Sequence, residues 1–243
     1  MSNIKVRFIT DYVCPYCYVA KKIFLDAAAD YDVDIQWINC ESTKTTEAQV
    51  DTFHDMAKKR QYKKEISPYV KKYKIPVKLP PAVVPRPYTH KAALGGLLAD
   101  ESGKREVYDQ AVTDAYFLKE KDIGKEEILA DLAESAGLER EAFLEALHSE
   151  QFEQKYEQQT DAILKEIQPE TLPTILIGDS VRLEGGIYTL EKYRQFLERA
   201  RKKLDASLIS IEEPVYYRDG STEKDFEEMK IVKGQGCNID GCY

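Results

Sequence analysis

Two cysteines separated by two residues stand where the first predicted strand of the chain meets its first predicted helix. Residues 4–9 alternate between apolar and charged side chains, which is the period of a strand that enters a core. Residues 16–30 place apolar side chains at helical spacing, with Lys21 and Lys22 expected on the solvent side. The sequence Cys14-Pro15-Tyr16-Cys17 lies between the two elements. The fold must therefore place both sulfurs at the N-terminal end of a helix, beside the end of a strand.

This position suits a reactive thiol. A thiolate, not a thiol, attacks disulfides, and an isolated cysteine is mostly protonated at neutral pH. At Cys14 the unpaired N–H groups and the positive end of the helix dipole favour the thiolate, and Pro15 is well tolerated in a first helical turn. Cys17 lies on the same helix face, within reach of Cys14 for a disulfide. We therefore predict thiol-disulfide exchange, in which Cys14 attacks a substrate disulfide and Cys17 resolves the mixed disulfide.

Zinc binding is the main chemical alternative for this cysteine pair. The chain has five cysteines, at positions 14, 17, 40, 237 and 242. The spacing of Cys14 and Cys17 is also common in zinc sites, where Cys237 and Cys242 would have to supply the other two ligands. The location at a strand-helix junction favours redox chemistry, because a thiolate gains most from the helix dipole there. We expect no metal and no bound cofactor.

Length, charge and apolar patterning argue against several classes of function and location. At 243 residues the chain can bury a core without disulfides as staples. Its net charge of −8 argues against a general affinity for nucleic acid, and no apolar run approaches the roughly 18 residues of a membrane span. The first eight residues mix charged and apolar side chains and lack the apolar core of a secretion signal. We therefore expect a cytoplasmic protein that binds neither nucleic acid nor membrane.

The predicted elements divide the chain into three parts. Strand patterns recur at residues 33–37, 174–177 and 181–184, and a helix is predicted for residues 189–203. Helical patterns fill the middle of the chain, at residues 92–100, 106–119, 125–136, 140–148 and 152–167. We therefore expect an α/β domain of residues 1–44 and 168–206, an inserted helical domain of residues 45–167, and a tail of residues 207–243.

A basic segment, one single cysteine and one histidine are interpreted as structural features. The segment from Lys58 to Lys78 carries nine basic residues and one acidic residue. A docking surface for acidic partners and a solvated helix face followed by an extended arm both fit this pattern, and we adopt the second. Cys40, at the end of a strand, is predicted to be a small buried side chain. His90 is predicted to stand at the start of a helix.

A second motif, Leu172-Pro173-Thr174, stands at the start of the strand predicted for residues 174–177. Together with the early cysteine pair, it looks like the cis-proline loop that faces the cysteines in thioredoxin-like folds. The chain resembles the DsbA-like thioredoxin superfamily, and within it the FrnE-like branch, in which a helical domain interrupts a thioredoxin fold. The resemblance covers nearly the whole chain and includes Ala115-Tyr116-Phe117, Asp122-Ile123-Gly124 and Ala136-Gly137-Leu138.

The resemblance implies a role for each residue of the cysteine motif. Cys14 would be the nucleophile and Cys17 the resolving cysteine, with Pro15 and Tyr16 beside the substrate. The dipeptide Pro15-Tyr16 resembles that of glutaredoxins and favours an intermediate reduction potential. The expected substrates and partners are protein or peptide disulfides and thiols, together with small thiols such as glutathione.

The resemblance also assigns residues far from this motif. Pro173 would follow a cis peptide bond, and the backbone of Leu172 would pair with an extended substrate peptide. Cys237 and Cys242 would form the second redox pair that some members of the branch carry.

Two alternatives come from other classes of protein. Glutathione-dependent isomerases and transferases of the kappa or hydroxychromene-carboxylate isomerase type share the inserted helical domain. They typically have serine at the reactive position, so the presence of both Cys14 and Cys17 counts against them. A non-enzymatic zinc-binding protein built on the four paired cysteines is the other alternative.

Overall fold

The sheet predicted from the two ends of the chain is present, and a strand that was not predicted completes it. The structure is a computed structural model that describes residues 3–209, 231–233 and 237–238. The strands are β1 (Ile4–Thr10), β2 (Val33–Asn39), β4 (Thr174–Ile177), β5 (Val181–Glu184) and β6 (Ile231–Lys233), in the order β2-β1-β4-β5-β6. β1 runs parallel to β2 and antiparallel to β4, β5 runs antiparallel to β4, and β6 runs parallel to β5.

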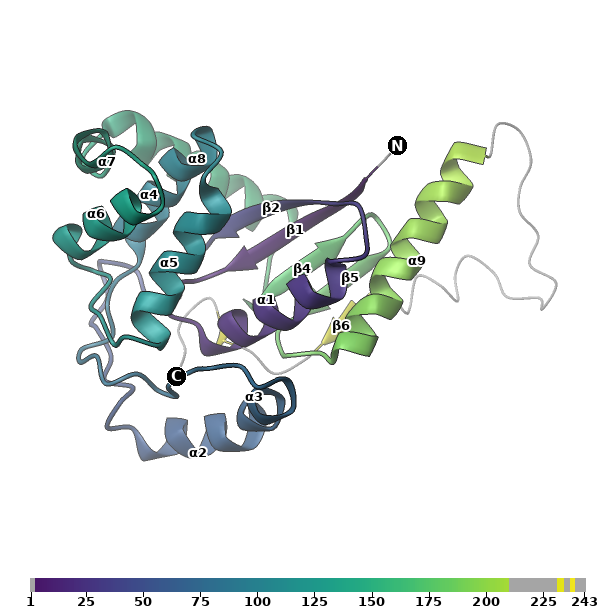
Figure 1. The fold of residues 1–243 in the computed structure, drawn as a ribbon, viewed down its shortest axis with the longest axis horizontal. Helices are drawn as coiled ribbons and strands as arrows, with labels where there is room; N and C mark the ends of the chain where they lie inside the picture. The colour runs from purple at the N-terminus through teal and green to yellow at the C-terminus, as the bar shows by residue number, and fades with distance from the viewer. Residues whose placement is uncertain (1–2, 210–230, 234–236, 239–243) are drawn as a thin grey trace.

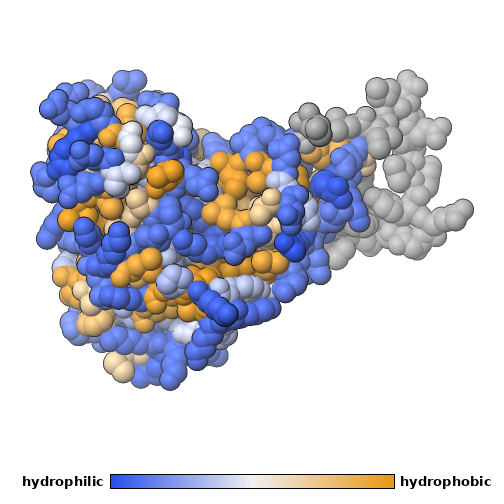
Figure 2. Space-filling model, viewed as in Figure 1, coloured by the Kyte–Doolittle hydropathy of each residue, from blue (hydrophilic) through white to orange (hydrophobic). Residues whose placement is uncertain are grey.

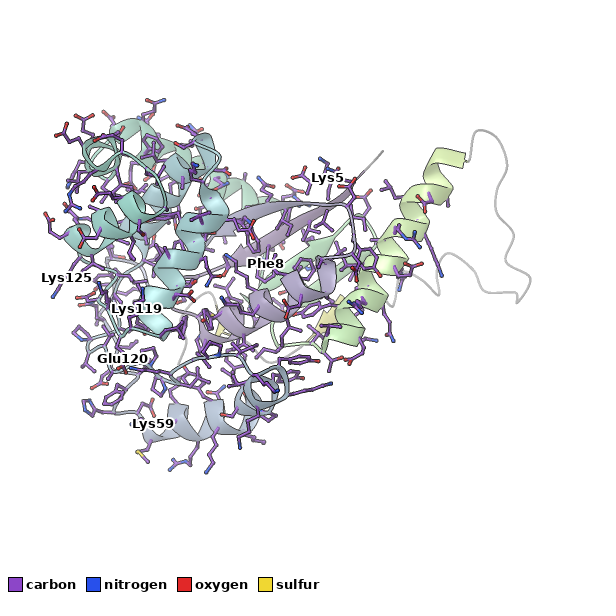
Figure 3. The ribbon with its side chains drawn as sticks, viewed as in Figure 1. Lys5, Phe8, Lys59, Lys119, Glu120 and Lys125 are labelled. Carbon is purple, nitrogen blue, oxygen red and sulfur yellow. The ribbon has the colours of Figure 1, made fainter. Side chains whose placement is uncertain are left out.

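Two helices pack together on one face of this sheet (Figure 1). They are α1 (Pro15–Ala28) and α9 (Leu190–Ile209), which is longer than predicted. The ring of Phe24 in α1 lies 5.8 Å from that of Phe8 in β1 and 5.4 Å from that of Tyr193 in α9, and Figure 3 labels Phe8 between the sheet and α1. Buried aromatic contacts of this kind fix both helices to the sheet.

The predicted helical insertion is confirmed. Five helices gather at one end of the sheet (Figure 1): α4 (His90–Glu101), α5 (Arg105–Phe117), α6 (Glu126–Ser135), α7 (Arg140–Ala146) and α8 (Glu150–Glu166). Gly137, with a φ of 85°, follows the end of α6 in the left-handed conformation that glycine adopts readily. The helices α2 (Met56–Glu65) and α3 (Ser67–Tyr73) lie apart from this group and lead into the irregular arm of residues 76–87.

Lys21 was expected on the solvent side of α1, and this expectation is wrong. Its side chain is buried, with its ammonium 3.8 Å from the carboxylate of Asp109 in α5 and 4.3 Å above the ring of Trp37. Arg105 donates to the same carboxylate at 3.0 Å, and the hydroxyl of Tyr12 donates to it at 2.5 Å. The helical insertion therefore covers this face of α1 and supplies the counter-charge, which the periodicity of α1 alone does not reveal.

The tail contributes two strands that were not predicted. Besides β6, the strand β7 (Cys237–Asn238) pairs antiparallel with β3 (Thr171–Leu172), with Leu172 opposite Cys237. Strands of two or three residues are too short to show a period of two in the sequence. Cys242, the other predicted member of the second cysteine pair, lies outside the described residues.

The visible surface is hydrophilic over most of its area (Figure 2). Apolar side chains gather where α1 ends and the edge strand β2 begins, along a shallow groove lined by Leu25, Ala28, Val33 and Ile35. Within the described ranges, no helix is both long enough and apolar enough to cross a membrane.

Candidate redox site

Cys14 is the N-cap residue of α1, as predicted. Its backbone is extended (φ −82°, ψ 112°), and its Sγ accepts a hydrogen bond from the N–H of Cys17 at 3.3 Å. Pro15 occupies the first turn, where a missing N–H leaves no bond unmade. Both thiols are free, and Cys14 is 0% exposed. The helix therefore offers a backbone N–H donor to the sulfur of Cys14, while the rest of the fold keeps solvent away from this sulfur.

Cys17 has a different environment. Burial raises the pKa of its thiol well above the usual value, and the neighbouring Cys14 adds to this rise. The N–H of Asp11 and the hydroxyl of Thr10 lower the pKa of Cys17 by hydrogen bonding, but burial outweighs them. Cys17 is thus held as a thiol. This asymmetry favours Cys14 as the attacking sulfur and Cys17 as the one that acts second.

Asp11 is a buried acid three residues before Cys14, and sequence analysis missed it. Its carboxylate accepts hydrogen bonds from the N–H of Ser42, at 2.9 Å, and from the hydroxyl of Ser42. Its carbonyl accepts from the N–H of Cys14 at 3.1 Å, so these bonds fix the loop that leads into the motif. A single acidic residue at a strand end carries no periodic signal that would mark it.

Cys40 is buried, as predicted. Burial raises the pKa of its thiol to about 12. A thiol with so high a pKa is almost wholly protonated at neutral pH, so Cys40 is an unreactive side chain of the core.

The motif around Pro173 lies at the end of the sheet that carries Cys14. Thr174 is opposite Ile9 in β1, so Pro173 lies beside the C-terminal end of β1, from which the chain runs into Cys14. The Leu172–Pro173 peptide bond is cis, as expected from the resemblance. The N–H of Gly185 donates to the carbonyl of Pro173 at 2.8 Å. The loop is therefore held by β5 in a fixed place.

Glu184 supports the same loop and was also missed. This buried carboxylate accepts hydrogen bonds from the hydroxyl of Thr174 at 3.0 Å and from the N–H of Glu170 at 3.3 Å. Arg182 pairs with its other oxygen. Alternation along β5 predicted a strand but gave no reason to assign Glu184 to the inner side.

Tyr16 joins the cysteine motif to α2. Its hydroxyl donates to the carboxylate of Glu65 and accepts from the side-chain amide of Gln61 at 3.1 Å. Its ring lies edge-to-face with that of Tyr62, with the centroids 6.3 Å apart. The helix α2 therefore lies against the motif. Lys58, on this helix, is buried, which contradicts the expectation of a fully solvated basic face.

The structure thus gathers six of the predicted site residues at one end of the sheet: Cys14, Pro15, Tyr16, Cys17, Leu172 and Pro173. Cys237 joins them through its backbone, opposite Leu172. In the described part of the chain, no group of three or more His, Cys, Asp or Glu side chains is arranged to hold a metal ion.

One protein family and one curated protein match this chain over most of its length. The family model of the DSBA-like thioredoxin domain matches residues 5–196. An uncharacterised protein of Bacillus subtilis, YwbO, is 32% identical over 179 residues, which is 74% of this chain and 89% of that protein.

Solved structures share the fold at low identity. A probable DsbA oxidoreductase of Streptomyces coelicolor superposes with a TM-score of 0.67 at 18% identity, covering 90% of this chain and 95% of that one. A 2-hydroxychromene-2-carboxylate isomerase superposes with a TM-score of 0.64 at 20% identity, covering 86% of this chain and all of the other (100%). The two structures have different activities, so at these identities the likeness concerns the fold, which is thioredoxin-like with an inserted helical region.

Proposed function

This chain belongs to the family of proteins with a DSBA-like thioredoxin domain, and from that premise we propose that it is a thiol-disulfide oxidoreductase or isomerase of the FrnE-like branch, working through Cys14 and Cys17 in the cytoplasm. One observation carries the proposal. The sulfur of Cys14 accepts a backbone N–H at the start of α1, whereas burial keeps Cys17 protonated. A dithiol with one sulfur prepared to attack and one held back is what stepwise disulfide exchange requires.

The exchange proceeds in two steps. The Cys14 thiolate attacks one sulfur of a substrate disulfide, so that the substrate S–S bond breaks, a mixed disulfide forms, and one substrate thiolate leaves. Cys17 then gives up its proton and attacks the sulfur of Cys14. This step forms the Cys14–Cys17 disulfide and releases the second substrate thiolate. The reverse sequence oxidises a substrate dithiol, and the chemistry needs no bound cofactor.

The pairing of β3 with β7 supports extended peptides as one class of substrate. The backbone edge of Leu172 accepts the two-residue strand that contains Cys237. An edge that binds one extended segment has the groups needed to bind another by strand addition. A substrate peptide would then compete with the tail, and Cys237 with Cys242 would act as a second redox pair.

An insulin-reduction assay tests the proposal. Cys14→Ser is expected to lose activity because the nucleophile is gone. Cys17→Ser is expected to accumulate a mixed disulfide with the substrate, visible by mass spectrometry, because the second step fails. Cys40→Ser, which alters a buried thiol outside the motif, is the control and should retain activity. Wild-type activity in Cys14→Ser would reject the proposed nucleophile, and one tightly held zinc with alkylation-resistant thiols would reject the redox function.

A further inference from the structure

A small hollow lies beside the redox motif, between the start of α1 and the arm of residues 76–87. The free space inside it is about 10 Å³, roughly enough for one water-sized group. Val13 and Pro15, the residues on either side of Cys14, form part of its wall, and Tyr62 and Arg86 form another part. Pockets for whole small molecules are generally larger, about 300 Å³ or more. This hollow therefore suits only one small polar group, such as a carboxylate oxygen, at the end of a ligand that lies mostly outside it.

Arg86 is the unusual member of this wall. Its side chain is only 3% exposed, and no described residue forms a hydrogen bond with its Nε. One Nη donates to the hydroxyl of Thr43, but no carboxylate among the described residues forms an ion pair with Arg86. Arg105, which is similarly buried, binds the carboxylate of Asp109 at 3.0 Å. A buried cation is costly unless it is paired, so the missing anion at Arg86 requires an explanation.

A second buried cation lies near Arg86. Lys58 in α2 is 7% exposed and forms no ion pair within the described ranges. Burial lowers the pKa of Lys58, Asp55 opposes this, and the positive charge of Arg86 lowers it further. The two carboxylates of α2 and its N-cap are engaged elsewhere, since Asp55 caps the helix and Glu65 binds Tyr16. Among the described residues, the two neighbouring cations thus have no carboxylate within ion-pair distance.

We propose that Arg86, supported by Lys58, is a subsite for a carboxylate carried by the disulfide substrate. A planar guanidinium recognises a carboxylate with two parallel hydrogen bonds, and a buried one does so with little competition from water. The hollow places that carboxylate beside Val13 and Pro15, the two sequence neighbours of Cys14. The inference rests on the proposed function, because it concerns which disulfides Cys14 attacks. The carboxylate can belong to a small disulfide or to an acidic side chain of a peptide.

Two disulfides that differ only in charge provide the test. They are 3,3′-dithiodipropionate and its dimethyl ester, and the measured quantity is the second-order rate constant for oxidation of the reduced full-length protein. Arg86→Gln is expected to slow the reaction with the dicarboxylate about tenfold or more, the range for loss of a charge-assisted hydrogen bond. The reaction with the ester should be nearly unchanged. Arg60→Gln removes an exposed cation from α2 and should change neither rate.

A second set of substrates identifies the source of the carboxylate. Disulfide-linked peptides with Glu beside the cysteine are compared with their Gln counterparts, in wild type and in Arg86→Gln. A preference for Glu that depends on Arg86 assigns the subsite to peptides, whereas a preference limited to dithiodipropionate assigns it to small disulfides. Either result supports a carboxylate subsite.

Other outcomes would overturn the subsite. One is an equal fall in the rate constants for the dicarboxylate and the ester in Arg86→Gln, because Arg86 would then act on Cys14 itself. If Arg86→Gln does not fold, competition in the wild type decides, with suberate as the isostere that lacks sulfur. If suberate does not slow the reaction of the protein with dithiodipropionate at matched ionic strength, the subsite is rejected. If the wild type reacts with none of these disulfides, the redox function fails instead, so the two failures are distinguishable.

Discussion

Leu172, the residue before the cis peptide bond of Pro173, lies opposite Cys237 in antiparallel register. The backbone edge that we propose for substrates is thus occupied by a segment of the chain itself. A cysteine in this register stands at the same end of the sheet as Cys14. If Leu172 binds substrates as we propose, the tail would compete with peptide substrates, and Cys237 would offer a thiol for exchange.

The first prediction is an internal mixed disulfide between Cys14 and Cys237. In Cys17→Ser the resolving thiol is absent, so a disulfide formed between Cys14 and the tail should persist. Oxidation with a stoichiometric amount of oxidant, followed by peptide mapping, should identify Cys14 linked to Cys237. The double variant Cys17→Ser/Cys237→Ser is the control. If Cys14 is instead found free or joined only to small thiols, the tail does not exchange with the motif.

The second prediction concerns access to Cys14, which has no exposed surface. The Tyr16 hydroxyl holds Glu65, and this bond keeps α2 against the motif. Tyr16→Phe should raise the rate of Cys14 alkylation by iodoacetamide about five- to tenfold, which corresponds to the loss of one hydrogen bond of about 1 kcal/mol or slightly more.

The matched control is Tyr31→Phe, whose hydroxyl donates at an exposed position to the carbonyl of Arg194. It should leave the alkylation rate as it is. Equal rates in Tyr16→Phe and wild type would mean that another segment limits access.

Long periodic segments account for the part of the fold that was predictable. The alternation in residues 4–9 and the helical spacing in α1 and α4 to α8 are local properties, and the structure confirms them. What failed depends on contacts between distant segments. Lys21 is buried because α5 covers it, and the bond from Tyr12 to Asp109 joins residues 97 positions apart. No pattern within one helix contains that information.

The residues of the candidate site also fall into those that the sequence predicts and those that only the structure shows. Cys14 and Cys17 are a local motif with a chemical reason for their spacing, so the sequence was sufficient to find them. Pro173 was found only through resemblance, since a proline at a strand start is common. Arg86 received no interpretation from the sequence. That no described carboxylate pairs with Arg86 is a property of its surroundings, which only the structure shows.

The third prediction concerns the buried ionic cluster around Asp109. In Asp109→Asn, the cations of Arg105 and Lys21 would stay buried without their carboxylate. Leaving a buried charge unpaired costs about 3–5 kcal/mol, and we expect a loss of this size in the free energy of unfolding, measured with urea. Asp131→Asn removes an exposed partner of Arg140 and should cost about 1 kcal/mol or less. Similar losses in both variants would show that the cluster is not a structural anchor.

His90 stands at the start of α4, as predicted, but it also joins three parts of the chain. One ring nitrogen lies 2.8 Å from Glu41, which follows β2, and the other lies 2.9 Å from Glu153 in α8. The hydrogen bond to Glu41 is the main cause that raises the pKa of His90 to about 9, against the opposing effect of burial. The protonated ring therefore links the α/β domain to the insertion at neutral pH.

The fourth prediction is a loss of stability at alkaline pH that depends on His90. The folded pKa of His90 is about 9, above the unfolded value near 6.5. Its stabilising contribution is thus complete below about pH 6.5, declines as the pH rises, and is lost above about pH 9. Because the ring is only partly buried, we expect about 1–2 kcal/mol rather than the full value of the shift.

Urea unfolding of wild type and His90→Gln, at about pH 6 and above pH 9, measures this contribution as the difference between the two proteins, so that other titrating groups cancel. The difference should be largest at the lower pH and shrink at the higher one. His148→Gln, which removes an exposed ring beside Glu126, should behave like wild type at both values. A difference that grows with pH would mean that the neutral ring is the stabilising form. That result would contradict the ionic link between Glu41 and Glu153.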